Sequence, residues 1–162
     1  GVRRVTTALQ SDQLAGVVDL FGALTPAELE RSLEELAFKQ GSEVDESGLA
    51  TAIEDAVASY ALVRYDREGT TLLVPGPAAF PTLPENAEDL PHILEIRERD
   101  VDREAAARAV AERLRTEAAR AVAEGDESAM RRLLDVTYDV AVWSDAVDVD
   151  DLRTRLDDEL DA

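Results

Sequence analysis

The hydrophobic pattern of the first half of the chain constrains the fold more than any other feature of the sequence. Apolar side chains recur three and four positions apart, the spacing of one helical face, over residues 11–24, 25–41 and 45–60. Ser11 or Asp12 is a candidate cap for the first helix. Thr25, with Glu28 three residues later, forms the reciprocal capping box of the second. The pattern therefore predicts three consecutive amphipathic helices.

The residues after these helices change to a strand-like pattern. The runs ALVRYD and TTLLVP are short and apolar, and they flank a polar turn that contains Gly69, which is typical of a hairpin. Three helices followed by a hairpin is the order of a winged-helix domain, and residues 11–76 resemble one. The resemblance implies that the third helix enters the major groove of DNA and that the hairpin contacts the backbone or minor groove. The implied DNA contacts are Arg64, Arg67, Arg3 and Arg4.

The charge of the third helix argues against DNA binding. No cation lies between Lys39 and Arg64, whereas carboxylates are frequent in that stretch: Glu43, Asp45, Glu46, Glu54 and Asp55. Because neutralised phosphates supply most of the affinity for DNA, such a helix would approach the duplex at an electrostatic loss. We therefore treat a DNA-binding transcriptional regulator of winged-helix type as the alternative function, with nucleic acid disfavoured as a partner.

Residues 74–96 contain five of the six prolines and the only histidine. The segment is too apolar for a flexible spacer, since its Leu, Ile and Phe side chains would be left in water. Prolines restrict the backbone at low entropic cost. We predict an ordered strap over residues 77–100, anchored by Phe80 and by its leucines and isoleucines.

The C-terminal region is predicted to be helical. Residues 102–124 form a long helix that ends at Gly125, and a further helix follows Asp126. Residues 136–143 also alternate like a strand, and the helix fits only slightly better. The predicted fold class is α+β and mostly α: a winged-helix-like module (11–76), a Pro-rich strap (77–100) and a C-terminal helical region (101–162), which can form one compact unit with the module.

Arginines are concentrated around the long helix: Arg97, Arg99, Arg103, Arg108, Arg113, Arg115 and Arg120. They alternate with carboxylates, including the favourable i, i+4 pair of Glu104 and Arg108. We interpret this stretch as a solvated face rich in ion pairs or as one side of a homodimer contact.

The formal net charge is −19, from 36 carboxylates against 17 cations, and Lys39 is the only lysine. Such a charge repels itself at low ionic strength, and molar salt screens the repulsion. An acidic protein of ordinary salt conditions is the alternative. The runs ELERSLEELAFKQG, LLVPGPAAFPTLPENAEDLPHI and LLDVTYDV resemble an uncharacterised family of acidic haloarchaeal proteins. This resemblance implies a salt-adapted cytoplasmic protein and implies no particular activity.

Few residues suit catalysis or metal binding. The chain has no cysteine and one histidine, so thiol nucleophiles and the HExxH zinc motif are excluded, and no phosphate-binding loop motif occurs. Asp148 and Asp150 have the first spacing of a calcium loop, but the required glycine is missing. His92 with Asp89 is the one candidate dyad, the minimum for a small hydrolase. No cofactor and no metal are predicted.

No apolar run approaches the roughly 20 residues that span a bilayer, so no membrane association is predicted. The predicted function is a non-enzymatic protein-interaction or regulatory module adapted to high salt, with a protein partner or self-association. A DNA-binding regulator is the alternative, and a small hydrolase is a distant third.

Overall fold

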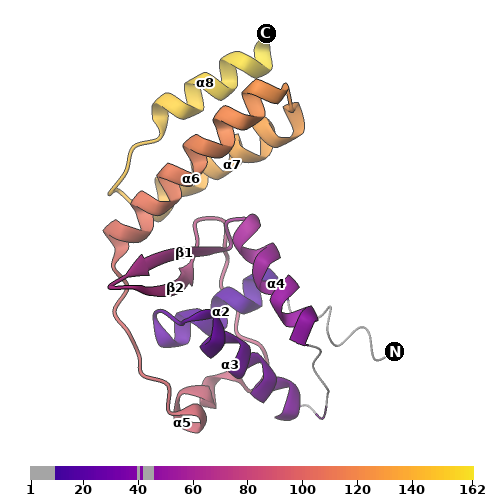
Figure 1. Cartoon of the computed structure of the whole chain (residues 1–162), viewed down its shortest axis with the longest axis vertical. Coiled ribbons are helices and arrows are strands. Elements are labelled where there is room, and N and C mark those ends of the chain that lie inside the picture. Colours follow the sequence, from indigo (N-terminus) through magenta and orange to yellow (C-terminus); the bar gives the residue numbers. More distant parts are fainter. Residues whose placement is uncertain (1–9, 40, 42–45) are drawn as a thin grey trace. The chain divides into compact units, whose positions relative to one another are not determined.

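The computed structural model describes residues 10–39, 41 and 46–162 of the chain. These residues belong to two compact units, residues 1–101 and 102–162, which are described separately below. Figure 1 shows helices and one hairpin in the first unit and only helices in the described part of the second. The predicted fold class, α+β and mostly α, is confirmed.

Three helices open the first unit: α2 (Ser11–Phe21), α3 (Pro26–Lys39) and α4 (Glu46–Ala58). The predicted capping box of α3 is present, because the Thr25 N–H donates to Glu28 Oε1 (2.9 Å) and the Glu28 N–H donates to Thr25 Oγ1 (3.1 Å). The predicted cap of α2 is wrong. Gln10 caps that helix in a reciprocal box with Gln13, and the Asp12 carboxylate binds a backbone N–H of the strap instead.

The predicted hairpin follows α4 and consists of β1 (Leu62–Arg67) and β2 (Thr70–Pro75), paired antiparallel along their whole lengths. Glu68 and Gly69 form the loop, and both have positive φ angles, 52° and 83°. A two-residue loop with two such angles matches the right-handed twist of the strands, and the second position favours glycine. Leu24, in the connection between α2 and α3, forms a β-bridge with Leu73 through hydrogen bonds of 3.1 and 2.7 Å.

The core of the first unit lies between the three helices and the inner face of the hairpin, with α2 beside both α4 and β2 (Figure 1). Its largest fully buried side chains come from all of these elements: Leu14, Phe21, Leu29, Leu33, Leu36, Leu49, Leu62 and Leu73. Aliphatic side chains at helical spacing therefore supply most of this core, as the pattern of the sequence predicts.

The strap belongs to the first unit. It includes a short 3-10 turn, η1 (Ala87–Asp89), and helix α5 (Leu90–Leu94), which packs against α3. Its backbone is hydrogen-bonded to α2 at two places: the Thr82 N–H donates to the Asp12 carbonyl (3.0 Å) and the Arg99 N–H donates to the Phe21 carbonyl (2.8 Å).

The predicted anchors of the strap are partly wrong. Phe80, Leu83 and Ile93 are 78%, 49% and 43% exposed, and the buried apolar contacts come instead from Ala87, Leu90 and Ile96. The backbone hydrogen bonds to α2 and these three side chains hold the strap, so that bulky Phe80 is not needed for the attachment.

Two glycines, Gly16 inside α2 and Gly22 at its C-terminal cap, allow the strap to lie close to this helix. A Cβ atom on Gly16 would lie 2.0 Å from the Thr82 carbonyl oxygen, and one on Gly22 would lie 1.9 Å from the Arg99 carbonyl oxygen. Gly22 also has a φ of 83°, which L side chains rarely adopt. The path of the strap over α2 therefore depends on the missing side chains at both positions.

The second unit contains α6 (Arg103–Glu124), α7 (Glu127–Trp143) and α8 (Asp150–Asp161), and each of them packs against the other two. Asp102 and Asp126 cap α6 and α7: their carboxylates accept hydrogen bonds from the N–H groups of Ala105 (3.0 Å) and Ala129 (3.1 Å). Residues 136–143 are helical, because they continue the buried face of α7 with Val136, Thr137 and Val140. Arg153 of α8 is hydrogen-bonded to the Thr137 carbonyl (3.0 Å) and stacks on Tyr138, which joins α8 to α7.

Candidate functional site

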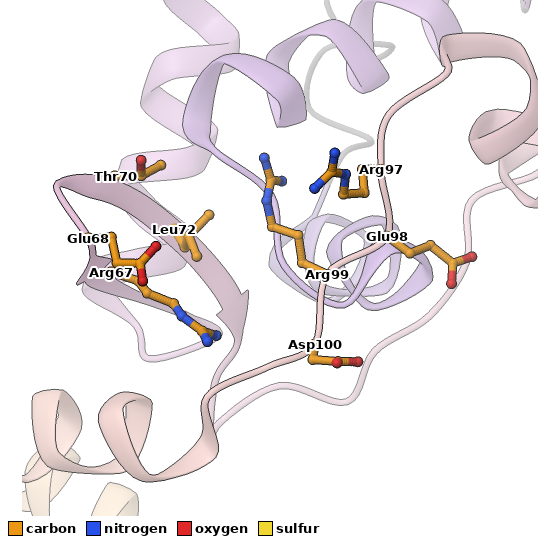
Figure 2. Close-up of a pocket in the computed structure, with 8 residues that line it drawn as sticks. All are labelled: Arg67, Glu68, Thr70, Leu72, Arg97, Glu98, Arg99 and Asp100. Carbon is orange, nitrogen blue, oxygen red and sulfur yellow. The ribbon is translucent and has the colours of Figure 1, made fainter.

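A cleft of about 400 Å³ lies in the first unit between the hairpin and the last residues of the strap (Figure 2). One wall is formed by Arg67, Glu68, Thr70 and Leu72 of the hairpin, and the other by residues 97–100. We call it the arginine cleft, because three of its eight lining residues are arginines. Its volume falls within the range of about 300–1,000 Å³ that is usual for ligand sites.

The two arginines on the strap wall share an orientation. In Figure 2 the side chains of Arg97 and Arg99 leave the strap on the side nearer the hairpin, whereas Glu98 and Asp100 leave it on the opposite side. This arrangement follows from an extended backbone, in which successive side chains point in opposite directions. Both arginines therefore leave the strap on the hairpin side, and the lining residues contain as many carboxylates as guanidinium groups.

Arg99 is fixed by contacts beneath the cleft. Its guanidinium donates to both carboxylate oxygens of Glu28 in α3 (2.5 and 3.2 Å) and to the Ala23 carbonyl (3.2 Å). Both side chains of this ion pair are mostly buried, with 28% and 22% of their surface exposed. A bidentate pair of this kind is stronger and more directional than an exposed contact. Arg99 therefore attaches the end of the strap to the helices and fixes one wall of the cleft.

Glu28 takes part in this attachment and in the capping box of α3 at the same time. Burial raises the pKa of the Glu28 carboxyl, but the hydrogen bonds from Arg99 and from the Thr25 backbone, with the nearby guanidinium charge, lower it by more. The net result is a pKa below the ordinary value, so Glu28 stays ionised in the folded chain.

Arg67 and Arg97 differ from Arg99 because they have no partner within residues 10–39, 41 and 46–162. Both side chains are exposed, and neither makes a hydrogen bond or ion pair with any residue of the described part of the chain. Several surface arginines share this property, but these two face one cleft from opposite walls. Two cations that line one cleft without counter-ions in the described part of the chain are suited to bind anionic groups of another molecule.

The four arginines that the winged-helix resemblance implies as DNA contacts do not share one environment. Arg67 lies in the cleft, whereas Arg64 forms an ion pair with Glu54 of α4 (3.2 Å) between exposed side chains. Arg3 and Arg4 lie outside the described residues, as do Glu43 and Asp45.

The described part of α4 exposes carboxylates rather than cations. Glu54 and Asp55 are exposed there, and the nearest cation, Arg64, already pairs with Glu54. The acidic face that the sequence indicates on the third helix is therefore found at the surface.

His92 and Asp89 are both exposed, His92 on α5 and Asp89 at the end of η1. Among the residues described here, no hydrogen bond or ion pair joins the two side chains. The pocket of Figure 2 does not include either of them. In addition, no group of three or more His, Asp or Glu side chains within residues 10–39, 41 and 46–162 is arranged to hold a metal ion.

Sequence reasoning missed the role of Arg97 and Arg99, which were grouped with the arginines of the long helix. Both lie before α6, in the strap, and Arg99 pairs with Glu28 rather than with a neighbour in sequence. The predicted pair of Glu104 and Arg108 is present on α6, at 3.8 Å between exposed side chains. The available signal was the alternation in the run IRERD, residues 96–100. Its second and fourth residues are arginines, which an extended backbone places on one side, and the other three are apolar or acidic.

Comparisons with known proteins add one finding. The family described as "Family of unknown function (DUF7109)" matches residues 12–161, which is nearly the whole chain. Searches of curated proteins and of solved structures found no significant match. Among the described residues, no helix is long and apolar enough to cross a membrane.

Proposed function

The chain belongs to this family of unknown function, and from the arginine cleft we propose that it is a non-enzymatic protein-interaction or regulatory module. The single observation that carries the proposal is the position of Arg67 and Arg97, which are exposed, have no partner among the described residues and lie on facing walls of one cleft. Arginine is enriched at protein interfaces and among the residues that dominate their binding energy.

The composition of the cleft suits a polypeptide better than a small substrate. It combines guanidinium groups with the Thr70 hydroxyl and with the carboxylates of Glu68, Glu98 and Asp100, a mixture that can pair with the varied side chains and backbone of another protein. No Ser, Cys, His or Lys side chain of the described residues lines it, and we therefore favour a function in binding over one in catalysis.

DNA is the second candidate partner, because Arg67 belongs to the hairpin that would be the wing and Arg97 faces it across the cleft. Two observations weigh against it. The exposed Glu54 and Asp55 are on the helix that would enter the groove, and Arg64 is already paired. The net charge of −19 adds long-range repulsion from phosphates at low salt.

Adaptation to high salt, in the cytoplasm, is part of the proposal. The excess of 19 carboxylates would repel itself in dilute buffer, and molar salt shortens the Debye length to about 3 Å. A partner must therefore be recognised by close, directional contacts such as those of a guanidinium fork, because long-range attraction is screened under these conditions.

The proposal is tested by affinity capture from cell extract in molar KCl, with the bound material scored for protein and for nucleic acid. We expect a discrete protein that is retained by the wild type and lost from the double variant Arg67→Gln/Arg97→Gln. The matched control is Arg31→Gln/Arg120→Gln, since both residues are exposed on helices away from the cleft residues in sequence. Retention of nucleic acid, or equal retention of the same protein by both double variants, would contradict the proposal.

A further inference from the structure

The arginine cleft also indicates which chemical group of a partner it binds. Each unpaired guanidinium offers several N–H donors in a planar fork, whose geometry matches the two oxygens of a carboxylate or two oxygens of a phosphate. The choice between these oxyanions depends on the other charges of the cleft.

Those charges favour the carboxylate. Glu68 lies on the hairpin wall next to Arg67, and Glu98 and Asp100 flank Arg97 and Arg99 along the strap wall, with their side chains on the side of the strap away from the hairpin. A phosphate group carries up to about two negative charges at neutral pH and is repelled by these side chains more strongly than a carboxylate with one. Arg99 supplies no additional free charge, because Glu28 neutralises it.

The position of the two free arginines adds to the argument. Arg67 ends β1 at the two-residue loop of the hairpin, and Arg97 lies in the strap, which is held to α2 by backbone hydrogen bonds. Both backbones are thus fixed before a ligand arrives, which lowers the entropic cost of binding. The side chains remain exposed, so a partner group can reach them without opening the core.

We propose that the arginine cleft binds carboxylate groups of an acidic polypeptide segment, with Arg67 and Arg97 as the pairing residues. This inference rests on the proposed function and names the recognised chemistry. The carboxylate comes either from Asp and Glu side chains of the segment or from its C-terminus, and the probes below distinguish these two sources.

The direct test is an NMR titration of the 15N-labelled protein, in which the Arg Nε–H resonances are followed in KCl at a concentration that keeps the chain folded. The probes are an amidated peptide of alternating Gly and Asp, the same peptide with Asn in place of Asp, a Gly-Asn peptide with a free C-terminus, inorganic phosphate and a single-stranded oligonucleotide. We expect saturable shifts of Arg67 and Arg97 with the Asp peptide or with the free C-terminus, and none with the amidated Asn peptide.

Variants make the test quantitative. Arg97→Gln removes one charged fork and is expected to weaken binding of the active peptide about tenfold, whereas Arg31→Gln leaves it unchanged. Both positions are exposed, so the fold is retained, as circular dichroism will show. Equal shifts at all exposed arginines, no shift with any peptide, or tighter saturable binding of phosphate or oligonucleotide would each overturn the proposal.

The titration and the affinity capture test different claims, so that a negative result in one can be told apart from a negative result in the other. If a captured protein depends on Arg67 and Arg97 but is not displaced by the Asp peptide or by the free C-terminus, the carboxylate inference is wrong and the proposed function stands. If no protein is captured in a way that depends on these arginines, the proposed function is wrong, whatever the peptides do.

Discussion

Replacing Gly16 by alanine tests how closely the strap lies on α2. In an ordinary exposed helix this change stabilises, because alanine has a helix propensity about 1 kcal/mol better than glycine. Here the new Cβ atom would lie 2.0 Å from the Thr82 carbonyl oxygen, whereas ordinary contact begins at 3.4 Å. The Thr82 backbone would have to move by more than about 1 Å, and it cannot rotate away like the end of a flexible side chain.

Two responses are open to the chain, and both are costly. If the strap stays in place, the overpacked contact costs about 1–3 kcal/mol. If it lifts, the hydrogen bonds from the N–H groups of Thr82 and Phe80 to Asp12 are lost, at roughly 1 kcal/mol each. After the propensity gain of about 1 kcal/mol is subtracted, the overpacked contact leaves a net loss of up to about 2 kcal/mol and the lifted strap one of about 1 kcal/mol. We therefore expect a net loss of about 1 kcal/mol, which lowers the melting temperature of a chain of this size by about 2–4 °C.

Thermal unfolding followed by circular dichroism measures the effect, and amide hydrogen exchange at Phe80 and Thr82 locates it. Ala50→Gly, at an exposed position of α4, is the matched control and is expected to cost about 1 kcal/mol through propensity alone. A higher melting temperature for Gly16→Ala, with unchanged protection of the two strap amides, would refute the close approach of the strap.

Three further predictions concern charge. Glu28→Gln should lower the melting temperature at neutral pH, because the pKa of Glu28 is depressed in the folded chain and its ionised form therefore stabilises the fold. The difference in melting temperature between variant and wild type should be largest above the ordinary pKa of 4.5 and should shrink as the pH falls through the folded pKa. Asp139→Asn should stabilise the folded chain by a few tenths of a kcal/mol at neutral pH, because burial and, to a smaller extent, the charge of Asp135 raise the pKa of Asp139. This gain in stability should disappear in acid, where the wild-type carboxyl is protonated. The melting temperature should rise steeply from dilute buffer to molar KCl, and a flat curve would contradict the salt-adaptation proposal.

Local signals in the sequence predict most of the fold. The spacing of Leu29, Leu33 and Leu36 defines α3, and Thr25 with Glu28 fixes where it starts. These signals suffice because caps and helical faces depend on residues within a few positions of each other. The exposed positions of Phe80 and Leu83 were missed because the burial of a strap depends on tertiary contacts that no local pattern contains.

The candidate site was harder to predict because its walls are distant in sequence. Arg67 was singled out from the hairpin pattern, but Arg97 joins it only through the path of the strap over α2. Glu28 and Arg99 are 71 residues apart, so their pairing is equally invisible to local reasoning. Besides the alternation in IRERD, Gly16 was a hint to the path of the strap, since a glycine inside a helical pattern often marks a close packing contact.

The most direct test of the arginine cleft as a binding surface is calorimetric titration of the captured partner against wild type and Arg67→Gln/Arg97→Gln in molar KCl. Losing two charge-assisted contacts should weaken the affinity by at least about tenfold, with an unchanged melting temperature because neither side chain has an intramolecular partner among the described residues. An unchanged affinity would show that the partner binds elsewhere and would contradict the central claim.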